Sequence, residues 1–117
     1  MTSGIEIRMN RILHKGKMLC IPMDHGISNG PIEGLEDPHS MIYKCEHHGL
    51  TSVIINKGIM KTLPKPTKIG LLVHFSSSTS LSTAPNRKML TGSVKEAIRL
   101  GADGISLHIN IGGKEEP

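Results

Sequence analysis

An aspartate, a histidine and a glycine end an apolar run near the start of this chain. Residues 21–23 read Ile-Pro-Met, and Asp24 follows them directly, ahead of a turn with glycines at positions 26 and 30. This pattern predicts a buried strand that delivers the Asp24 carboxylate to the rim of a sheet. Catalytic groups of α/β barrels lie where strands end and loops begin. We therefore expect acid–base chemistry at Asp24, the alternative being a cap that only stabilises the turn.

Three further ionisable side chains lie at or within two residues of the end of an apolar run: Lys57, His74 and His108. Desolvation inside a barrel lowers the pKa of a lysine amine and favours Schiff-base formation. A lysine at a strand end, however, more often pairs with a phosphate or a carboxylate. We favour such pairing for Lys57 over a role as the nucleophile.

The histidines raise the alternative of a metal site at the same edge, because histidine is a common zinc ligand. Asp24 is followed by His25, but the first strand end does not carry two histidines separated by one residue. We therefore predict no metal and favour hydrogen-bonding roles for His25, His74 and His108. His74 and His108 have two equally good interpretations. Each is either a polar side chain that merely ends a strand or a residue that contacts the substrate.

Helix and strand patterns alternate along the chain and position these groups. Asp37 and Pro38 can begin a helix that Gly49 ends, and the pair Ser93 and Glu96 has the spacing of a capping box that opens a helix over 94–100. Strands are predicted at 18–23, 52–56, 69–75 and 104–110. The alternation indicates an α/β domain with a parallel sheet, either a barrel or a doubly wound sheet.

The connections between these elements are expected to be mostly irregular. Residues 26–36 form a long loop that contains glycine, and residues 76–83 are a run of small, mainly hydroxyl-bearing residues. The connection after residue 57 contains Pro64 and Pro66 and is too short for a full crossover helix. The first strand is expected to be buried on both faces. Because proline lacks the donor of the ladder, Pro22 should lie at the end of this strand or where that donor has no partner.

Composition argues against nucleic-acid and membrane partners. The 117 residues carry a formal net charge of +4 but only 2% aromatic residues, and the basic residues are scattered, so no base-stacking surface is expected. No apolar run is long enough to cross a bilayer, and the start lacks a secretory signal, which predicts a cytoplasmic protein. Cys20 and Cys45 have neither metal-ligand nor redox spacing and are expected to be buried, reduced thiols.

Several segments together resemble the archaeal-type class I aldolases. They are the amino-terminal arm at 6–13, the aspartate-bearing loop at 24–28, the strand ends at 56–59 and 72–76, and the helix and strand at 94–110. The Ser-Asn-Gly-Pro continuation at 28–31 favours the heptulosonate synthase branch over the archaeal fructose-bisphosphate aldolases. The resemblance selects the barrel, and it implies a partial (β/α)8 TIM barrel of roughly the first four strands.

The resemblance implies Schiff-base chemistry without a cofactor, with Asp24 moving protons. A fragment of a ketofructose-type sugar phosphate would be joined to L-aspartate semialdehyde, on the way to 3-dehydroquinate and the aromatic amino acids. The family's lysine lies on the sixth strand and its tyrosine follows the fifth, so neither falls within this chain; Tyr43, inside the first predicted helix, is a poor substitute. The candidate substrate-binding residues are Asp24, His25, Gly26, Ile27 and Ser28, followed by Lys57, His74 and His108.

A complete barrel needs about 250 residues, so we expect residues 1–117 to be the amino-terminal half of a single domain, truncated at its carboxyl end. The complete protein is expected to be a homo-oligomeric enzyme, and this chain alone to be inactive. Two alternatives stay open. One is an archaeal-type class I fructose-bisphosphate aldolase, and the other is a non-catalytic half-barrel that serves as an assembly module.

Overall fold

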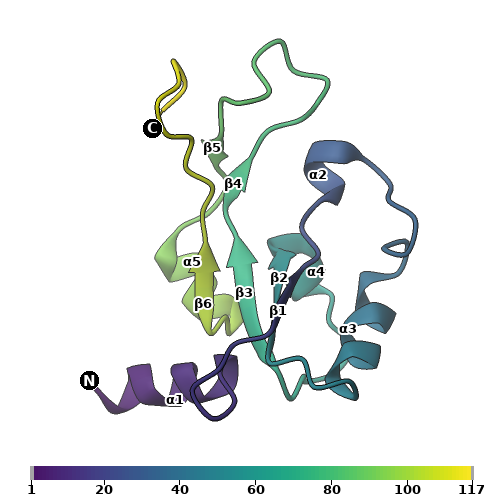
Figure 1. Cartoon of the computed structure of the whole chain (residues 1–117), viewed down its shortest axis with the longest axis vertical. Helices are drawn as coiled ribbons and strands as arrows, with labels where there is room; N and C mark the ends of the chain where they lie inside the picture. The colour runs from purple at the N-terminus through teal and green to yellow at the C-terminus, as the bar shows by residue number, and fades with distance from the viewer. Residues whose placement is uncertain (1, 117) are drawn as a thin grey trace.

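The computed structural model describes residues 2–116 and has four parallel strands at its centre (Figure 1). The sheet order is β1-β2-β3-β6, with β1 at Cys20–Pro22, β2 at Ser52–Asn56, β3 at Gly70–His74 and β6 at Gly104–Ser106. All three pairings are parallel, and successive strands of this sheet lie side by side. This is the strand order of one continuous stretch of a barrel wall.

Five helices accompany the strands in the described part of the chain: α1 (Ser3–Ile12), α2 (Gly26–Asn29), α3 (Pro38–Glu46), α4 (Lys57–Lys61) and α5 (Val94–Leu100). The predicted caps are confirmed, since the Asp37 side chain accepts from Ser40 N at 3.1 Å and the Ser93 side chain from Glu96 N at 3.2 Å. Gly101 ends α5 with a φ of 79°, a left-handed conformation that favours glycine.

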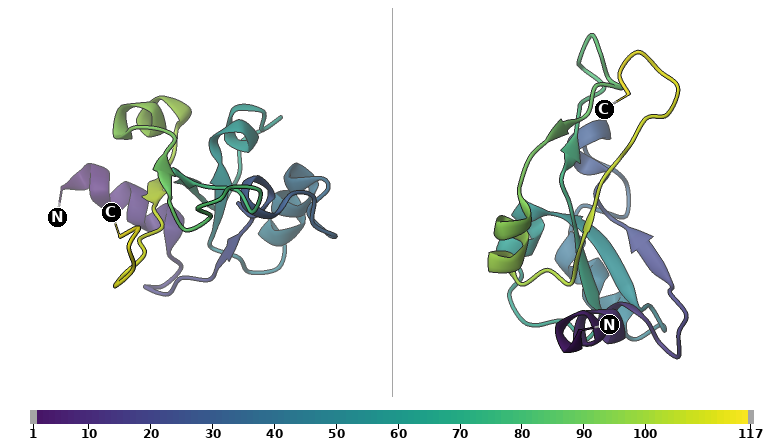
Figure 2. Two further views of the ribbon diagram at one scale, coloured as in Figure 1. Left: turned by 90° about the horizontal axis from the view of Figure 1, so that it is seen from above. Right: turned by 90° about the vertical axis from the view of Figure 1, so that its left-hand side faces the viewer.

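The hydrophobic core lies between one face of the sheet and helices α3, α4 and α5. Alternate residues of β2 and β3 point to this face, where they pack against Ile42 of α3, Met60 of α4 and Ala97 of α5. The buried strand residues are Val53, Ile55, Leu71 and Val73. Seen from above, α4 and α5 lie together on one side of the strands (Figure 2, left).

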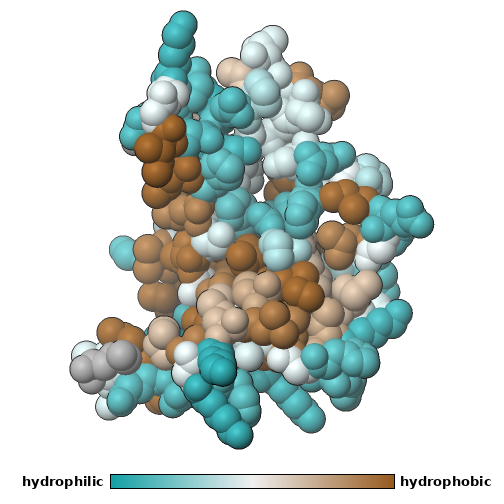
Figure 3. Space-filling model, in the orientation of Figure 1, coloured by the Kyte–Doolittle hydropathy of each residue, from teal (hydrophilic) through white to brown (hydrophobic). Residues whose placement is uncertain are grey.

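The opposite face of the sheet is open and partly apolar. Ile54 and Leu72 lie in one row across β2 and β3 and are only half-buried. On the face that turns toward the viewer in Figure 1, apolar surface gathers over the strands (Figure 3). In a complete barrel this face would point into the interior.

At the amino ends of the strands, α1 lies beneath the sheet and packs against β3 (Figure 2, right). Ile12 is buried there, and the Arg11 guanidinium donates from Nε to Asp103 Oδ1 at 2.7 Å. Asp103 Oδ2 accepts from Leu71 N at 2.9 Å, so one carboxylate joins the helix to the sheet. The amino-terminal arm of the sequence is therefore a helix that closes one end of the fold.

Several sequence expectations are wrong in detail. The strand predicted at 18–23 is shorter and is not buried on both faces: Ile21 is 39% exposed, because β1 is an edge strand with one neighbour in this sheet. The strand predicted at 104–110 ends at Ser106. Cys20 and Cys45 are free thiols, as expected, but they are half-buried rather than buried.

The predicted loops also contain short regular elements. The first turn after Asp24 forms helix α2, and the hydroxyl-rich run begins with β4 (Ser76–Ser77), which pairs antiparallel with β5 (Met89–Leu90). The expectation that no full crossover helix follows β2 is confirmed, because α4 has five residues. Pro22 is the last residue of β1, as predicted. Within residues 2–116, no helix is both long and apolar enough to cross a membrane.

Candidate active site

A row of polar residues crosses the open face of the sheet at the carboxyl ends of its strands. The strand register pairs Asn56 of β2 with His74 of β3, and His74 with Ser106 of β6. Pro22 of β1 pairs with Ile54, two residues before Asn56, so Asp24 follows β1 at the same level. Four side chains from four neighbouring strand ends are thus brought to one edge.

Asp24 is fixed at this edge by contacts from two strands. Asn56 donates from Nδ2 to the backbone oxygen of Asp24 at 3.1 Å, which holds the main chain. His74 Nε2 lies 3.5 Å from Asp24 Oδ2, which is ion-pair distance when the imidazole is protonated. The Asp24 side chain is 21% exposed, so its carboxylate is held without being sealed from solvent. Such an arrangement suits a group that exchanges protons with a bound molecule.

His74 is held from its other side by Ser106. Its Nδ1 lies 2.9 Å from the Ser106 hydroxyl oxygen, at hydrogen-bond distance. The sequence placed Asp24 and His74 at one edge, and the structure brings them into contact. Asn56 and Ser106 were not predicted as members of the site. The signal that could have found them is the strand register, which puts both residues level with His74.

The turn after Asp24 is a single helical turn in which several backbone carbonyls accept hydrogen bonds. The His25 carbonyl accepts from Ser28 N at 3.1 Å and from Asn29 N at 2.9 Å, and the His25 side chain is exposed. Ser28 is half-buried, and its carbonyl accepts from Ser80 N at 3.0 Å, which ties the turn to the hydroxyl-rich loop. Gly26 and Ile27 face a cavity beside the polar row.

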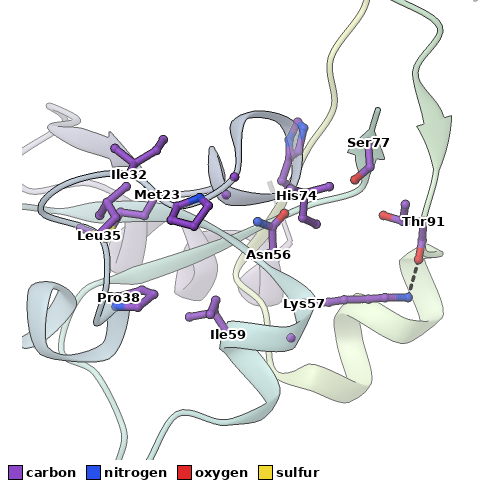
Figure 4. Close-up of a pocket in the computed structure, with 15 residues that line it drawn as sticks. Met23, Ile32, Leu35, Pro38, Asn56, Lys57, Ile59, His74, Ser77 and Thr91 are labelled. Atoms are coloured by element: carbon purple, nitrogen blue, oxygen red, sulfur yellow. Dashed lines mark hydrogen bonds between the residues drawn. The ribbon is translucent and has the colours of Figure 1, made fainter. Parts of the chain in front are cut away.

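This cavity has a volume of about 630 Å³ and lies between the turn after β1, the end of β2 and helix α4 (Figure 4). Most of its wall is apolar, and Asn56, His74 and Lys57 contribute polar groups. The apolar side chains include those of Met23, Ile27, Ile32, Leu35 and Ile59. The cavity is thus continuous with two members of the polar row.

Lys57 lies at the start of α4, and its amine is already paired. It donates to the Thr91 carbonyl, as the dashed line in Figure 4 shows, and lies 3.4 Å from Glu96 Oε1. Burial raises the pKa of the Glu96 carboxyl, but the hydrogen bond and charge of Lys57, with the charge of Lys61, hold that pKa below its ordinary value. Lys57 is thus paired with a carboxylate, one of the two kinds of partner expected for a lysine at a strand end.

The other two side chains considered, those of His108 and Tyr43, have partners other than Asp24. His108 is exposed, its backbone N–H donates to Ser76 Oγ at 3.0 Å, and its Nε2 lies 2.9 Å from Asn110 Oδ1. Tyr43 donates its hydroxyl to the Lys65 carbonyl at 2.7 Å. Within residues 2–116, no group of three or more histidine, cysteine, aspartate or glutamate side chains is arranged to hold a metal ion.

The chain is similar in sequence to two archaeal enzymes that share one name. The chain is 40% identical over 116 residues to the 2-amino-3,7-dideoxy-D-threo-hept-6-ulosonate synthase of Halobacterium salinarum, covering 98% of this chain and 44% of the relative. It is also 40% identical to a synthase of the same name from Archaeoglobus fulgidus, over 97% of this chain and 44% of the relative. The chain thus spans less than half the length of these curated relatives.

Solved structures agree on the fold. The chain resembles a Schiff-base-forming fructose-1,6-bisphosphate aldolase with a TM-score of 0.81 at 24% identity, over 97% of this chain and 47% of that one. A second structure, an archaeal fructose-1,6-bisphosphate aldolase with its catalytic lysine covalently bound to a carbinolamine intermediate, gives a TM-score of 0.80 at 25% identity, over 95% and 47%. The four-stranded sheet is accordingly part of a TIM barrel.

A family model described as the DeoC/LacD family aldolases matches residues 18–117, which include every strand and every candidate residue discussed above. This match covers most of the chain, and it agrees with the parallel sheet and with the polar row at the carboxyl ends of the strands. The chain belongs to the DeoC/LacD family of aldolases.

Proposed function

We propose that residues 1–117 supply the acid–base half of the active site of a class I aldolase-type synthase, with Asp24 as the group that moves protons. The observation that carries the proposal is the Asp24 carboxylate itself. It lies at the carboxyl end of a barrel strand, where Asn56 holds the Asp24 backbone oxygen and His74 faces the carboxylate, which is still partly accessible. A turn cap alone would not require contacts from two further strands.

The proposed substrates are a ketofructose-type sugar phosphate and L-aspartate semialdehyde, whose union leads toward 3-dehydroquinate and the aromatic amino acids. The support is the 40% identity to two heptulosonate synthases and the Ser-Asn-Gly-Pro sequence after the aspartate loop. A synthase of Streptomyces griseus that is 31% identical makes, by its name, a phosphonooxyheptanoate. We assign substrate contact to Asp24 and the turn at 25–28, and place the enzyme in the cytoplasm as a homo-oligomer.

In the proposed reaction, a lysine from the remaining half of the barrel condenses with the substrate ketone and releases water. Asp24 then accepts the proton of a substrate hydroxyl while the adjacent carbon–carbon bond breaks. The hydroxyl carbon becomes an aldehyde and leaves as hydroxypyruvaldehyde phosphate, and the electron pair of the broken bond moves into the iminium to give an enamine. The enamine carbon attacks the aldehyde carbon of L-aspartate semialdehyde. Asp24 returns its proton to the new alkoxide, and hydrolysis of the iminium frees the lysine.

A hybrid barrel tests this proposal. Residues 1–117 would replace the aligned segment of the Halobacterium salinarum synthase, with the unaltered synthase as control. We expect the hybrid to consume the sugar phosphate together with L-aspartate semialdehyde, and to form a borohydride-trapped adduct with its own lysine. A matched hybrid places the same residues in an archaeal fructose-1,6-bisphosphate aldolase, where we expect little cleavage of fructose 1,6-bisphosphate.

Two outcomes would overturn the proposal. Activity confined to the second hybrid would favour a fructose-bisphosphate aldolase, the second candidate, which is supported by the similarity to those solved structures. Two hybrids that unfold cooperatively but turn over neither substrate would favour a non-catalytic half-barrel.

The 117-residue chain alone should not form a Schiff base. The Lys57 amine is engaged with Glu96 and with the Thr91 carbonyl, and it is not assigned as the nucleophile. Borohydride reduction in the presence of a ketose phosphate should leave the mass of the chain unchanged. A stoichiometric adduct at Lys57 would contradict this expectation.

A further inference from the structure

His74 lies between two polar groups that belong to the strand ends on either side of it. Its Nε2 is 3.5 Å from Asp24 Oδ2, and its Nδ1 is 2.9 Å from Ser106 Oγ. The His74 side chain is only 13% exposed, so these two groups rather than bulk water are its main polar surroundings. The ring thus links the end of β1 to β6 across β3.

The chemistry of the two neighbours selects the tautomer of a neutral ring. An ionised carboxylate can only accept hydrogen bonds, so the contact with Asp24 favours the tautomer in which the ring nitrogen that faces it carries the hydrogen. The other nitrogen, Nδ1, is then an acceptor, and the Ser106 hydroxyl can donate to it. If the ring becomes protonated, the same hydroxyl can turn and accept from Nδ1, so Ser106 stays a partner in both states.

From this geometry we infer that His74 is a positioning residue for Asp24, and that Ser106 fixes its tautomer. His74 holds Oδ2 of the carboxylate and leaves Oδ1 directed to the substrate as the proton acceptor. Asn56 completes the arrangement by holding the Asp24 backbone. The inference rests on the proposed function of Asp24, and it gives His74 a role other than contact with the substrate.

The first test reads the tautomer in the 117-residue chain itself by nitrogen NMR of the histidine rings. At pH 8, where an ordinary imidazole is neutral, we expect a His74 ring proton on Nε2 that exchanges slowly with water, and an unprotonated Nδ1. Asp24→Ala and Ser106→Ala should each remove the slow exchange. The exposed ring of His48 serves as the internal control, since it should exchange rapidly in all three proteins.

The second test measures turnover in the active hybrid barrel with two matched substitutions. A glutamine amide nitrogen reaches about as far as Nε2 of histidine, whereas an asparagine amide nitrogen reaches only as far as Nδ1. His74→Gln should therefore keep most of kcat. His74→Asn should lower kcat about 10–100-fold, by analogy with the loss when the partner that orients a metal ligand is removed, with a much smaller change in KM.

A double-substitution cycle separates positioning from a merely structural role. In the Asp24→Asn background, His74→Asn should cost little further activity, because the group that His74 orients is already disabled. Losses that multiply independently would contradict the inference. So would equal losses in His74→Gln and His74→Asn, or a rise in KM with kcat unchanged, which is the signature of substrate contact.

The two tests also separate this inference from the proposed function. A proton on Nδ1, or an Nε2 proton that is unaffected by Asp24→Ala, overturns the positioning role even if the hybrid barrel is fully active. Hybrids that fold but do not turn over substrate overturn the proposed function and the catalytic part of the inference together. The tautomer result then still decides whether His74 orients the carboxylate.

Discussion

Two aspartates at opposite ends of the sheet are held in different ways. At the amino ends, the Asp103 side chain is 6% exposed and both of its oxygens are used, Oδ1 by Arg11 at 2.7 Å and Oδ2 by the Leu71 N–H at 2.9 Å. At the carboxyl ends, the Asp24 side chain is 21% exposed, and the contact recorded for its carboxylate is with His74 at 3.5 Å. The first group is sealed, and the second is held but accessible.

One residue type is thus expected to serve stability at the amino ends of the strands and chemistry at the carboxyl ends. A buried carboxylate with complete partners fixes α1 to the sheet, and a change there exposes or orphans its partners. A carboxylate with spare hydrogen-bonding capacity beside a cavity can take a proton from a ligand. In TIM barrels, the amino end of the strands carries stability and the carboxyl end carries catalysis.

The largest effect is expected at Asp24. Asp24→Asn keeps the size of the side chain but removes the base, so kcat of the hybrid barrel should fall by about 10²–10⁴-fold, the usual contribution of general acid–base catalysis. The urea midpoint of the 117-residue chain should hardly change, because this carboxylate does not seal the core. Near-normal turnover would reduce Asp24 to a turn cap and remove the contrast between the two ends.

Asp103→Ala is the reciprocal change at the amino end. It leaves the Leu71 N–H without its partner and frees Arg11, and hydrogen bonds to a charged group are worth roughly 1.5–3 kcal/mol. We expect the free energy of unfolding to fall by about 2 kcal/mol in urea titrations of the chain. In the hybrid barrel, kcat per folded molecule should be preserved. A selective loss of kcat without a loss of stability would contradict the division of roles.

Much of this fold could be predicted from the sequence, because the strongest local signals agree with the tertiary structure. The central strands β2 and β3 are continuous apolar runs, and their predicted bounds hold to within one residue at each end. The caps at Asp37 and Ser93 depend only on neighbouring residues, so they too were predictable. The edge strands β1 and β6 were predicted too long. Apolar character alone does not show at which residue a strand stops pairing with its neighbour.

The missed features depend on contacts between distant residues. Helix α1 is held by Ile12 and Arg11 against the sheet, and its own sequence gave no clear helical signal. In the site, the positions of Asp24 and His74 followed from strand ends. Asn56 and Ser106 required the register, which a single sequence does not contain.

A smaller effect is expected where α1 approaches the sheet most closely. A Cβ atom on Gly70 would lie 2.9 Å from the Arg11 carbonyl oxygen and 2.9 Å from Ile12 Cα, and both are backbone atoms that cannot rotate away. Gly70→Ala should therefore displace α1 and lower the free energy of unfolding by roughly 1–2 kcal/mol, as overpacking does. Gly58→Ala is the matched control, since its Cβ would meet no atom within 4 Å. Equal urea midpoints for the two variants would show that α1 is not tightly seated.

The smallest effect is expected at Glu96, whose ion pairs with Lys57 and Lys61 are exposed or half-buried. Burial raises the pKa of this carboxyl, but the hydrogen bond and charge of Lys57 and the charge of Lys61 bring it below the ordinary value. A lowered pKa in the folded state means that the stabilisation is present at neutral pH and is lost as the pH falls through the folded-state value.

Glu96→Gln should accordingly lower the urea midpoint slightly at pH 7, and the difference from the parent chain should vanish in acid, below the usual glutamate range. Raising the salt concentration to about 1 M should shrink the difference at pH 7 as well, because exposed pairs are screened. A difference that persists in acid would show that Glu96 acts through packing rather than charge. Comparison with Asp103→Ala tests whether stability at the amino ends of the strands depends on burial. Asp103 and Glu96 are both paired with a charged side chain, but only Asp103 is sealed from solvent.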